Sequence, residues 1–297
     1  MATSLYVSNV QLTAVCGAGS YTRMKIKQCA SVPLPSGAVL NGVITDEKLL
    51  SDALTALREQ LGPRINTVRL AVSSSQIFVK RAVVPKVSHR KLLELIKNEF
   101  TEVDVGGDEL LCDYRILAQN GKDGGQTALL CAARRSLIAN YDEFYRANHI
   151  RLTGVDVTVD ALGKLVRLLP ELREATFILL DLDGNAIEAT LYVQGEFRYY
   201  NRTRLMNERG TPESVSEITR LVSSIIQFNT SERSGQSIAA VRLLGARDTE
   251  TALMTSLQTA FDIPCTPLAD ERGTIRAAGC DIPALSAYAC AIGNLIE

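Results

Sequence analysis

Along the first 170 residues, apolar positions either alternate with polar ones or recur at helical spacing. Alternation and β-branched residues predict β-rich segments over residues 3–15 and 22–32. Leucines at helical spacing predict a helix over residues 46–61, capped by Thr45 and ended by Gly62-Pro63. These leucines are Leu50, Leu54, Leu57 and Leu61. The same patterns predict further strands over residues 68–72, 77–84, 111–118, 127–133 and 152–158, and helices over residues 88–100, 136–148 and 160–169.

Pro170 and the polar stretch after it mark the best boundary between two domains. Beyond it, three strands are predicted over residues 176–182, 187–193 and 197–205, separated by turns at Asp183-Gly184-Asn185 and at Gly195. A helix over residues 212–228, a strand over 241–244, a helix over 248–261 and a closing helix over 283–296 follow. Two mixed α/β lobes, each opening with a strand meander, are the architecture that this order favours.

Composition narrows the classes of function. The 297 residues are 46% hydrophobic, and 32 Lys and Arg balance 33 Asp and Glu, so no field over the whole protein favours nucleic acid. Two basic stretches, over residues 80–91 and 198–204, are better explained as solvated or protein-binding faces. We therefore predict a soluble globular protein that does not bind nucleic acid.

The chain lacks the motifs of a working active site or a metal centre. Its seven cysteines form no C-x-x-C pair, and most lie in apolar surroundings, which indicates free thiols in a reducing cytoplasm. Its two histidines, His89 and His149, have no spaced ligands beside them, so no zinc site is expected. There is no G-x-x-x-x-G-K-[ST] loop and no G-x-G-x-x-G motif. We predict that the protein is not an enzyme.

Several local strings resemble the PilM family of type IV pilus assembly proteins. The strongest is TALLCAARRSLIANY at residues 127–141, preceded by DYRIL at 113–117. RLAVS at 69–73, KRAVVP at 80–85, Asn98-Glu99, Val155-Asp156 and Asp160-Ala-Leu162 continue the match. This family belongs with the actin-like fold of the division protein FtsA, which the cytoplasmic domain of the secretion protein GspL shares.

The resemblance implies a two-lobed actin-like (ribonuclease H-like) α/β fold with an inserted small α/β subdomain. The first lobe would comprise residues 1–72, continued at 152–172 and 283–297. The inserted subdomain would comprise residues 73–151, and the second lobe residues 173–282.

Active members of the actin-like fold hold Mg·ATP between two hairpins and a glycine turn. In the first hairpin, normally Asp-x-Gly-Ser/Thr…Lys, this chain has Tyr6, Ser8 and Thr13 at the Asp, Gly and Lys positions. In the second, normally Asp-x-Gly, Asp181 is kept, Asp183 replaces the glycine and Gly184 comes one step late. The glycine turn is reduced to Gly245. The degenerate nucleotide positions are Ser8, Asn9, Asp181, Asp183, Gly184 and Gly245.

These departures predict that the protein neither hydrolyses ATP nor binds it. Each lost charge-assisted contact costs about 1.5–3 kcal/mol, so two losses weaken binding roughly 10²–10⁴-fold. A low micromolar dissociation constant for Mg·ATP would contradict this prediction. Without the resemblance, Asp183-Gly184-Asn185 is simply a hairpin turn.

The resemblance also implies a partner. Members of the family bind the short N-terminal cytoplasmic tail of a single-span protein, PilN, between the first lobe and the inserted subdomain. Here the groove would be lined by the strand Ile77–Val84 and the facing first lobe, with Ile77, Val79 and Arg81 as candidate contacts. Ordinary core and rim positions are the other interpretation of these three residues.

The sequence thus predicts a non-catalytic cytoplasmic scaffold on the inner face of the cytoplasmic membrane. It would bind a PilN-like tail and other pilus platform and motor proteins, and the family suggests a ring or other homo-oligomer. Two alternatives stay open: a weak or regulatory ATP-binding protein of the same fold, and the homologous platform subunit of type II secretion.

Overall fold

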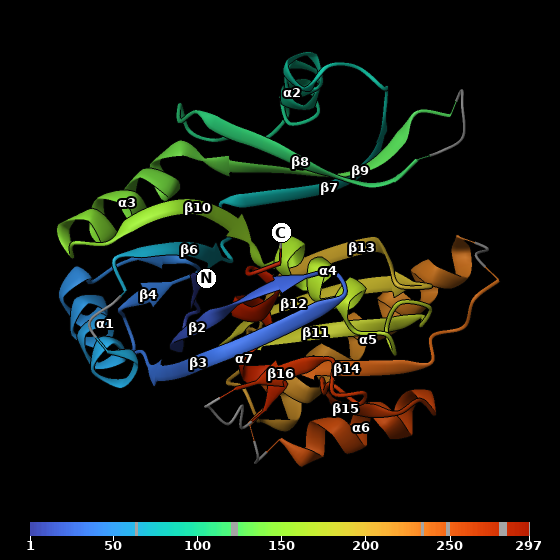
Figure 1. Ribbon diagram of the computed structural model, residues 1–297. Helices are drawn as coiled ribbons and strands as arrows, with labels where there is room; N and C mark the ends of the chain where they lie inside the picture. The colour runs from blue at the N-terminus through green and yellow to red at the C-terminus, as the bar shows by residue number, and fades with distance from the viewer. Residues whose placement is uncertain (63–64, 120–123, 233–234, 248–249, 279–283, 297) are drawn as a thin grey trace.

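The computed structural model describes residues 1–62, 65–119, 124–232, 235–247, 250–278 and 284–296 (Figure 1). Two lobes, each built on one large sheet, carry a smaller three-stranded sheet that stands over the first lobe. Pro63, residues 248–249, residue 283 and residue 297, which entered the predictions above, lie outside the described residues.

The first lobe is a six-stranded sheet in the order β10-β6-β1-β2-β3-β16. Its strands are β1 (Ala2–Val7), β2 (Gln11–Ser20), β3 (Arg23–Pro33), β6 (Thr67–Val72), β10 (Arg151–Val157) and β16 (Ile275–Ala277). The β-rich segment expected over residues 3–15 is two antiparallel strands, β1 and β2. Ser8 separates them because its Oγ accepts hydrogen bonds from the main-chain N–H groups of Val10 and Gln11, at 3.1 and 2.9 Å, which fixes a turn.

Helix α1 (Glu47–Leu61) buries Leu50, Leu54, Leu57 and Leu61, the four leucines that predicted it. Its N-cap is Asp46 and not Thr45, which corrects the prediction: the Asp46 side chain accepts from Leu49 N at 3.0 Å. The Thr45 hydroxyl instead donates to the Gly37 carbonyl at 2.6 Å, in the loop before the helix. The short strands β4 (Val39–Leu40) and β5 (Val43–Ile44), which the sequence did not predict, form the two-stranded sheet in that loop.

Helix α3 (Arg135–Ala147) packs into the first lobe. Tyr141, Phe144 and Tyr145 are buried in the same hydrophobic core as the α1 leucines. By packing, the inserted subdomain therefore ends with β9, earlier than the predicted residue 151. The physical reason is that three large aromatic side chains on one helix face bury their apolar surface in the first-lobe core.

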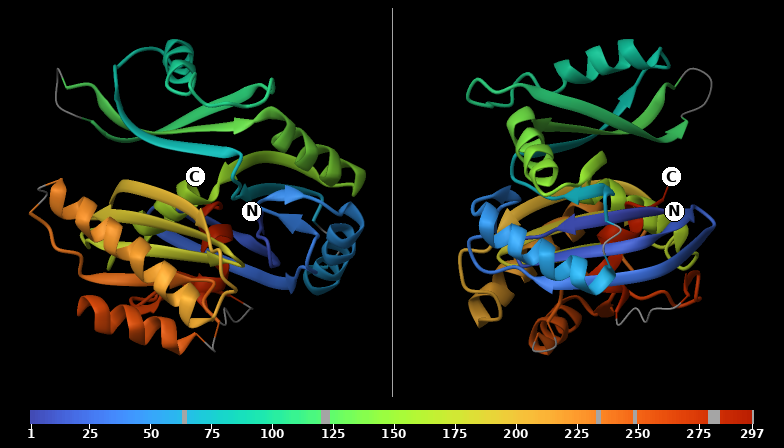
Figure 2. Two further views of the ribbon diagram at one scale, coloured as in Figure 1. Left: turned by 180° about the vertical axis from the view of Figure 1, so that it is seen from behind. Right: turned by 60° about the vertical axis from the view of Figure 1, so that its left-hand side comes forward.

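The inserted subdomain consists of β7 (Ile77–Val84), α2 (His89–Asn98), β8 (Leu110–Gln119) and β9 (Gln126–Arg134). The strand order is β7-β9-β8, so β8 is an edge strand. One face of this sheet is covered by α2, where Leu92 and Ile96 are buried. The other face looks toward β10 and the lobes, as both views in Figure 2 show.

The second lobe confirms the predicted meander of β11 (Phe177–Asp183), β12 (Ala186–Val193) and β13 (Glu196–Arg204). Strands β14 (Ala240–Leu244) and β15 (Cys265–Pro267) extend its sheet in parallel. Helices α5 (Pro212–Ser231) and α6 (Thr251–Phe261) cover it with Ile218, Val222, Ile225, Leu253 and Leu257. Strand β16 falls in the range predicted for this lobe, yet it pairs with β3 of the first lobe.

Helices α4 (Thr158–Leu168) and α7 (Leu285–Gly293) pack together at the junction of the two lobes. A Cβ on Gly293 would lie 2.0 Å from the Ala161 carbonyl oxygen, so only glycine allows the two helices to come this close. Ile296 forms a bridge to Gly19 of β2 in the first lobe. Among the described residues, no helix has the length and apolar character needed to cross a membrane.

Candidate functional site

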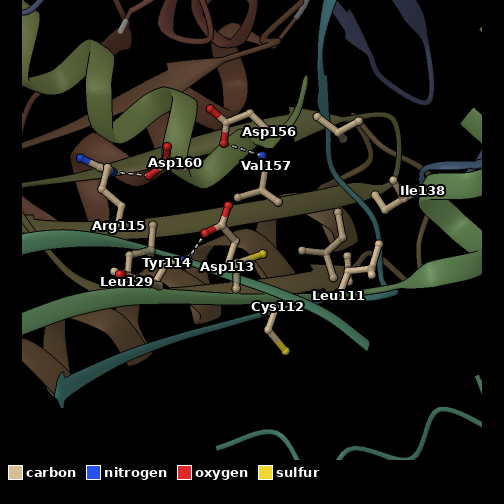
Figure 3. A pocket seen from close by; sticks show the side chains of 14 residues that line it. Leu111, Cys112, Asp113, Tyr114, Arg115, Leu129, Ile138, Asp156, Val157 and Asp160 are labelled. Atoms are coloured by element: carbon tan, nitrogen blue, oxygen red, sulfur yellow. Dashed lines mark hydrogen bonds and ion pairs between the residues drawn. The ribbon is translucent and has the colours of Figure 1, made fainter. Parts of the chain in front are cut away.

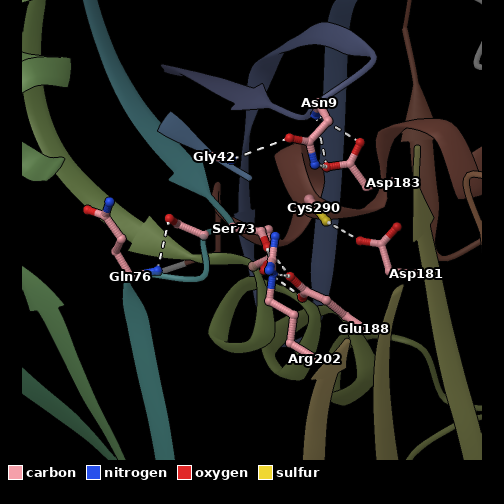
Figure 4. Close-up of polar contacts among 11 residues, drawn as sticks. Asn9, Gly42, Ser73, Gln76, Asp181, Asp183, Glu188, Arg202 and Cys290 are labelled. Atoms are coloured by element: carbon pink, nitrogen blue, oxygen red, sulfur yellow. Dashed lines mark hydrogen bonds and ion pairs between the residues drawn. The ribbon is translucent and has the colours of Figure 1, made fainter. Parts of the chain in front are cut away.

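The two hairpin turns of the predicted nucleotide site face each other and are bonded directly (Figure 4). The main-chain N–H of Asn9 donates to both carboxylate oxygens of Asp183, at 2.8 and 2.9 Å, and Asn9 Nδ2 donates to Oδ2 at 2.6 Å. Asn9 Oδ1 in turn accepts from Gly42 N at 3.3 Å. Asp183, at the end of β11, therefore holds the β1–β2 turn of the other lobe.

This bridge is buried, and burial affects the charge of its carboxylate. Asp183 is 7% exposed. Burial raises the pKa of Asp183, while the hydrogen bonds from Asn9 oppose the rise. A main-chain N–H that could face an anionic ligand is thus already bonded to a carboxylate of the protein itself.

Asp181 lies two residues earlier on β11, where burial and neighbouring carboxylates disfavour its charged form. It is 7% exposed, and the Cys290 thiol of α7 donates to its Oδ2 at 3.7 Å. Burial raises its pKa well above the ordinary value, and the nearby carboxylates of Glu188 and Asp183 raise it further. Tyr6, at the position where active relatives have an aspartate, is buried beside these acids, and burial raises its pKa too.

Gly184 and Gly245 both adopt the left-handed backbone, with φ of +61° in each. A Cβ on Gly245 would lie 2.4 Å from the Leu182 carbonyl oxygen, so the close approach of these two turns requires glycine. Arg209 fixes the same turn: its guanidinium donates to the carbonyls of Leu182 (2.8 Å) and Gly245 (2.6 Å). Its remaining N–H groups bond both carboxylate oxygens of Glu250, each at 2.6 Å.

A cavity of about 300 Å³ lies where these turns meet. Ser8, Asp181, Asp183 and Gly245 line it, and Asn9 and Gly184 occupy the two turns at its edge. The fold therefore brings all six of the degenerate nucleotide positions together at the junction of the lobes. Within this set, Asn9 and Asp183 are joined directly by hydrogen bonds.

A second cavity, of about 370 Å³, lies between the inserted subdomain and the first lobe (Figure 3). Consecutive residues of two edge strands line it, Leu111–Arg115 of β8 and Val155–Val157 of β10. The other lining residues are Ile77, Leu129, Cys131, Ala133, Ile138 and Asp160. We call this cavity the groove; half of its lining residues are aliphatic, and Arg115 and three aspartates are the charged ones.

Ion pairs at the charged part of the groove join α4 to the subdomain and to β10. Arg115 of β8 pairs with Asp160 of α4, and Lys164 bonds Asp156 at 2.6 Å and Asp160 at 3.0 Å. Burial and the neighbouring Asp160 raise the pKa of Asp156, although Lys164 opposes the rise. Arg167 of α4 adds a bond from its Nη2 to the Leu117 carbonyl of β8 at 2.7 Å.

The three candidate contacts on β7 separate in the structure. Ile77 lines the groove. Val79 packs on the central core between the lobes. Arg81 lies near Arg198 of β13. Burial lowers the pKa of Arg81, and the positive charge of Arg198 lowers it further. Of the three, Ile77 alone is among the residues that line the groove.

The family model for "Type IV pilus assembly protein PilM" matches residues 5–265 of this chain. The chain belongs to the PilM family. Its structure is similar to that of a PilM-PilN type IV pilus biogenesis complex, with a TM-score of 0.82 at 17% identity, covering 99% of this chain and 97% of the other. The family match names the pilus protein and not the secretion subunit that the sequence left as an alternative.

A Bacteroides thetaiotaomicron protein of unknown function with an actin-like ATPase fold is also similar, with a TM-score of 0.51 at 12% identity over 89% of this chain and 90% of the other. At these identities the likeness establishes the fold, and the predicted actin-like architecture is confirmed. No curated protein sequence matches the chain.

Sequence reasoning missed the residues that hold the lobes of this PilM-family chain together. The Glu188 carboxylate of β12 accepts a hydrogen bond from the hydroxyl of Ser73, which follows β6, and another from the hydroxyl of Thr158 of α4 at 3.0 Å. The Arg202 guanidinium lies 3.6 Å from the same carboxylate (Figure 4). Arg209 and Glu250, which pair with each other within the second lobe, were missed as well. Glu188 is the one charged residue of the apolar strand β12, whereas Arg209 and Glu250 lie in polar stretches. What the three share is burial, at 5–7% exposure.

Proposed function

We propose that this protein is a non-catalytic scaffold of the type IV pilus inner-membrane assembly platform. Its groove would bind the N-terminal cytoplasmic tail of a PilN-like single-span membrane protein, which places the scaffold on the inner face of the cytoplasmic membrane. The observation that carries the proposal is the groove itself, a cavity of about 370 Å³ in a PilM-family chain, with seven aliphatic residues among the fourteen that line it. The similar solved structure is that of a PilM-PilN type IV pilus biogenesis complex.

The groove suits an extended peptide. Both β8 and β10 are edge strands, and an edge strand offers a row of backbone N–H and C=O groups to a chain laid beside it. Leu111, Ile138 and Leu129 supply aliphatic surface for alternate side chains of such a chain. A tail of this kind would gain main-chain hydrogen bonds from the edge and specificity from the pockets.

The residues at the junction of the lobes do not fit Mg·ATP. The main-chain N–H of Asn9 already donates its hydrogen bond to the Asp183 carboxylate, and this carboxylate would repel a polyphosphate. Tyr6 is buried where active relatives supply a carboxylate, and Arg209 is fully engaged with Glu250 and two carbonyls. We therefore propose that the protein does not use ATP. The cavity of about 300 Å³ beside Gly245 keeps weak nucleotide binding as the second candidate.

Binding of a fluorescently labelled synthetic peptide of the PilN-like tail tests the scaffold proposal. Leu111→Glu places a charge in the groove at a residue that is already 36% exposed, so folding should be preserved. Leu40→Glu on β4, at 52% exposure and outside the groove lining, is the matched control. We expect the first variant to bind at least about tenfold more weakly, because a charge in an apolar contact leaves it desolvated, and the control to bind normally. A wild-type protein that ignores the peptide would refute the proposal.

A further inference from the structure

The charges that line the groove are unequal in number. Three carboxylates, those of Asp113, Asp156 and Asp160, face one guanidinium, that of Arg115. Lys164 bonds both Asp156 and Asp160, and Arg115 bonds Asp160, so two of the three acids have cationic partners within the protein. Among the ion pairs of the described residues, none includes Asp113.

Asp113 is also the acid that a ligand can reach. Its side chain is exposed. Among the described residues it has one hydrogen bond, in which the Asp113 Oδ1 accepts from the main-chain N–H of Tyr114 at 2.8 Å. Because strand residues alternate, Leu111, Asp113 and Arg115 lie on the same face of β8. Figure 3 shows the Asp113 carboxylate directed from β8 toward Val157 of β10, across the groove.

Asp113 shares this part of the groove lining with two further acids, Asp156 and Asp160. Asp113 stands opposite Cys131 in the β8–β9 register. Burial raises the pKa of the Cys131 thiol, and the carboxylates of Asp156, Asp160 and Asp113 raise it further. Arg115 does not cancel this field, because its guanidinium is bonded to Asp160 on the side of α4.

The occupant proposed for the groove brings the complementary charge. Cytoplasmic segments next to a membrane span carry an excess of Lys and Arg. We propose that Asp113 recognises a lysine or arginine of the bound tail, with the aliphatic lining on the Leu111 side receiving its apolar residues. This inference rests on the proposed function and adds the charge selectivity of the same site. Asp113 thereby selects basic tails and disfavours acidic ones.

The test compares Asp113→Asn and Asp113→Lys with wild type for binding of the labelled tail peptide. Asp52→Asn and Asp52→Lys, at an exposed position of α1 outside the groove lining, are the matched controls. At low salt we expect about threefold to tenfold weaker binding for Asp113→Asn and a larger loss for Asp113→Lys. Both differences should shrink in about 0.5 M NaCl, because salt screens an exposed ion pair.

Peptides in which each Lys or Arg is replaced singly by Gln identify the partner residue. One such replacement should weaken peptide binding to wild type by the same factor as the Asp113→Asn substitution does. The same replacement should not weaken peptide binding to the Asp113→Asn variant any further. Replacing the same peptide residue by Glu should restore binding to Asp113→Lys. Binding of Asp113→Lys within twofold of wild type would overturn the inference and leave the scaffold proposal standing. Failure of wild type to bind the tail would reject the proposed function, and this inference with it.

Discussion

Asn9 and Asp183 are 174 residues apart in sequence, and the main-chain N–H of Asn9 lies 2.8 and 2.9 Å from the two carboxylate oxygens of Asp183. The contact joins the β1–β2 turn of one lobe to the end of β11 in the other. The resemblance to the actin-like fold led us to expect a nucleotide between these two turns. Here a carboxylate of the protein provides the anion, so the two lobes are held together without a ligand.

Asp183→Asn should weaken this bridge. The substitution keeps the size of the side chain but removes the charge and leaves one acceptor oxygen for three donor contacts. Because hydrogen bonds to a charged group contribute about 1.5–3 kcal/mol each, we expect a loss of about 1–3 kcal/mol in the free energy of unfolding. Amide hydrogen exchange at Asn9 should accelerate as well.

The matched control for that measurement is Asp262→Asn, at an exposed left-handed position after α6 that asparagine tolerates. Its stability and exchange should match wild type. Unchanged exchange at Asn9 in Asp183→Asn would show that the bridge does not hold the turn.

Asp181→Asn should alter how stability depends on pH. Burial raises the pKa of Asp181 in the folded protein, so above the ordinary value of 3.8 the folded state binds more protons than the unfolded chain. Stability contributed by this group therefore falls as pH rises from about 4 toward the raised pKa. The asparagine side chain of the variant cannot ionise, so the variant should lose less stability over that range. The difference in free energy of unfolding between the variant and wild type should be largest at alkaline pH, in favour of the variant.

Thermal unfolding between about pH 4.5 and pH 8.5 measures this effect. Burial raises the pKa of Asp183 in the same direction, so the variant should keep part of the pH dependence. Asp52→Asn on the exposed face of α1 serves as the control and should follow the wild-type curve. A variant as pH-dependent as wild type would mean that Asp181 is not the buried acid responsible.

Arg209→Met should destabilise the second lobe. The side chains of Arg209 and Glu250 are only 3% and 5% exposed, so removing the guanidinium leaves a buried carboxylate without its partner. Breaking a buried pair of this kind costs about 3–5 kcal/mol. Arg209→Met with Glu250→Gln should recover part of the loss, because the second change removes the isolated charge.

Denaturant unfolding resolves these variants. Arg90→Met is the control, because Arg90 and its partner Glu94 are 92% and 66% exposed and such pairs contribute about 0–1 kcal/mol. An Arg209→Met protein as stable as the control would mean that the pair does not fix the Gly245 turn.

Mg·ATP titration by calorimetry tests the proposal that nucleotide is not used. Wild type should show a dissociation constant of about 1 mM or weaker, because two charge-assisted contacts are lost. Asp183→Gly frees the Asn9 N–H and removes the repelling carboxylate, so it should bind more tightly than wild type. Low micromolar binding by wild type would favour the second candidate, a regulatory ATP-binding protein.

The pattern of apolar and polar residues predicted most helices and strands of this fold, and each of its errors has an identifiable physical cause. The leucine spacing located α1, but Thr45 and Asp46 are both good caps, and only the loop contact of Thr45 with Gly37 decides between them. Strands β15 and β16 are three residues each, too short to show an alternating pattern, and they exist because neighbouring strands pair with them.

The sequence by itself determined the helices, the hairpin turns and the loss of the nucleotide motif, since each depends on residues close together in the chain. Only the tertiary structure decided that Asp183 bonds Asn9, that α3 joins the first lobe, and that Asp113 faces the groove while Arg81 lies beside Arg198. The physical reason is that alternation along a strand divides its residues between two faces without saying what covers either face. Long-range packing makes that choice, because it buries the most apolar surface that the connections allow.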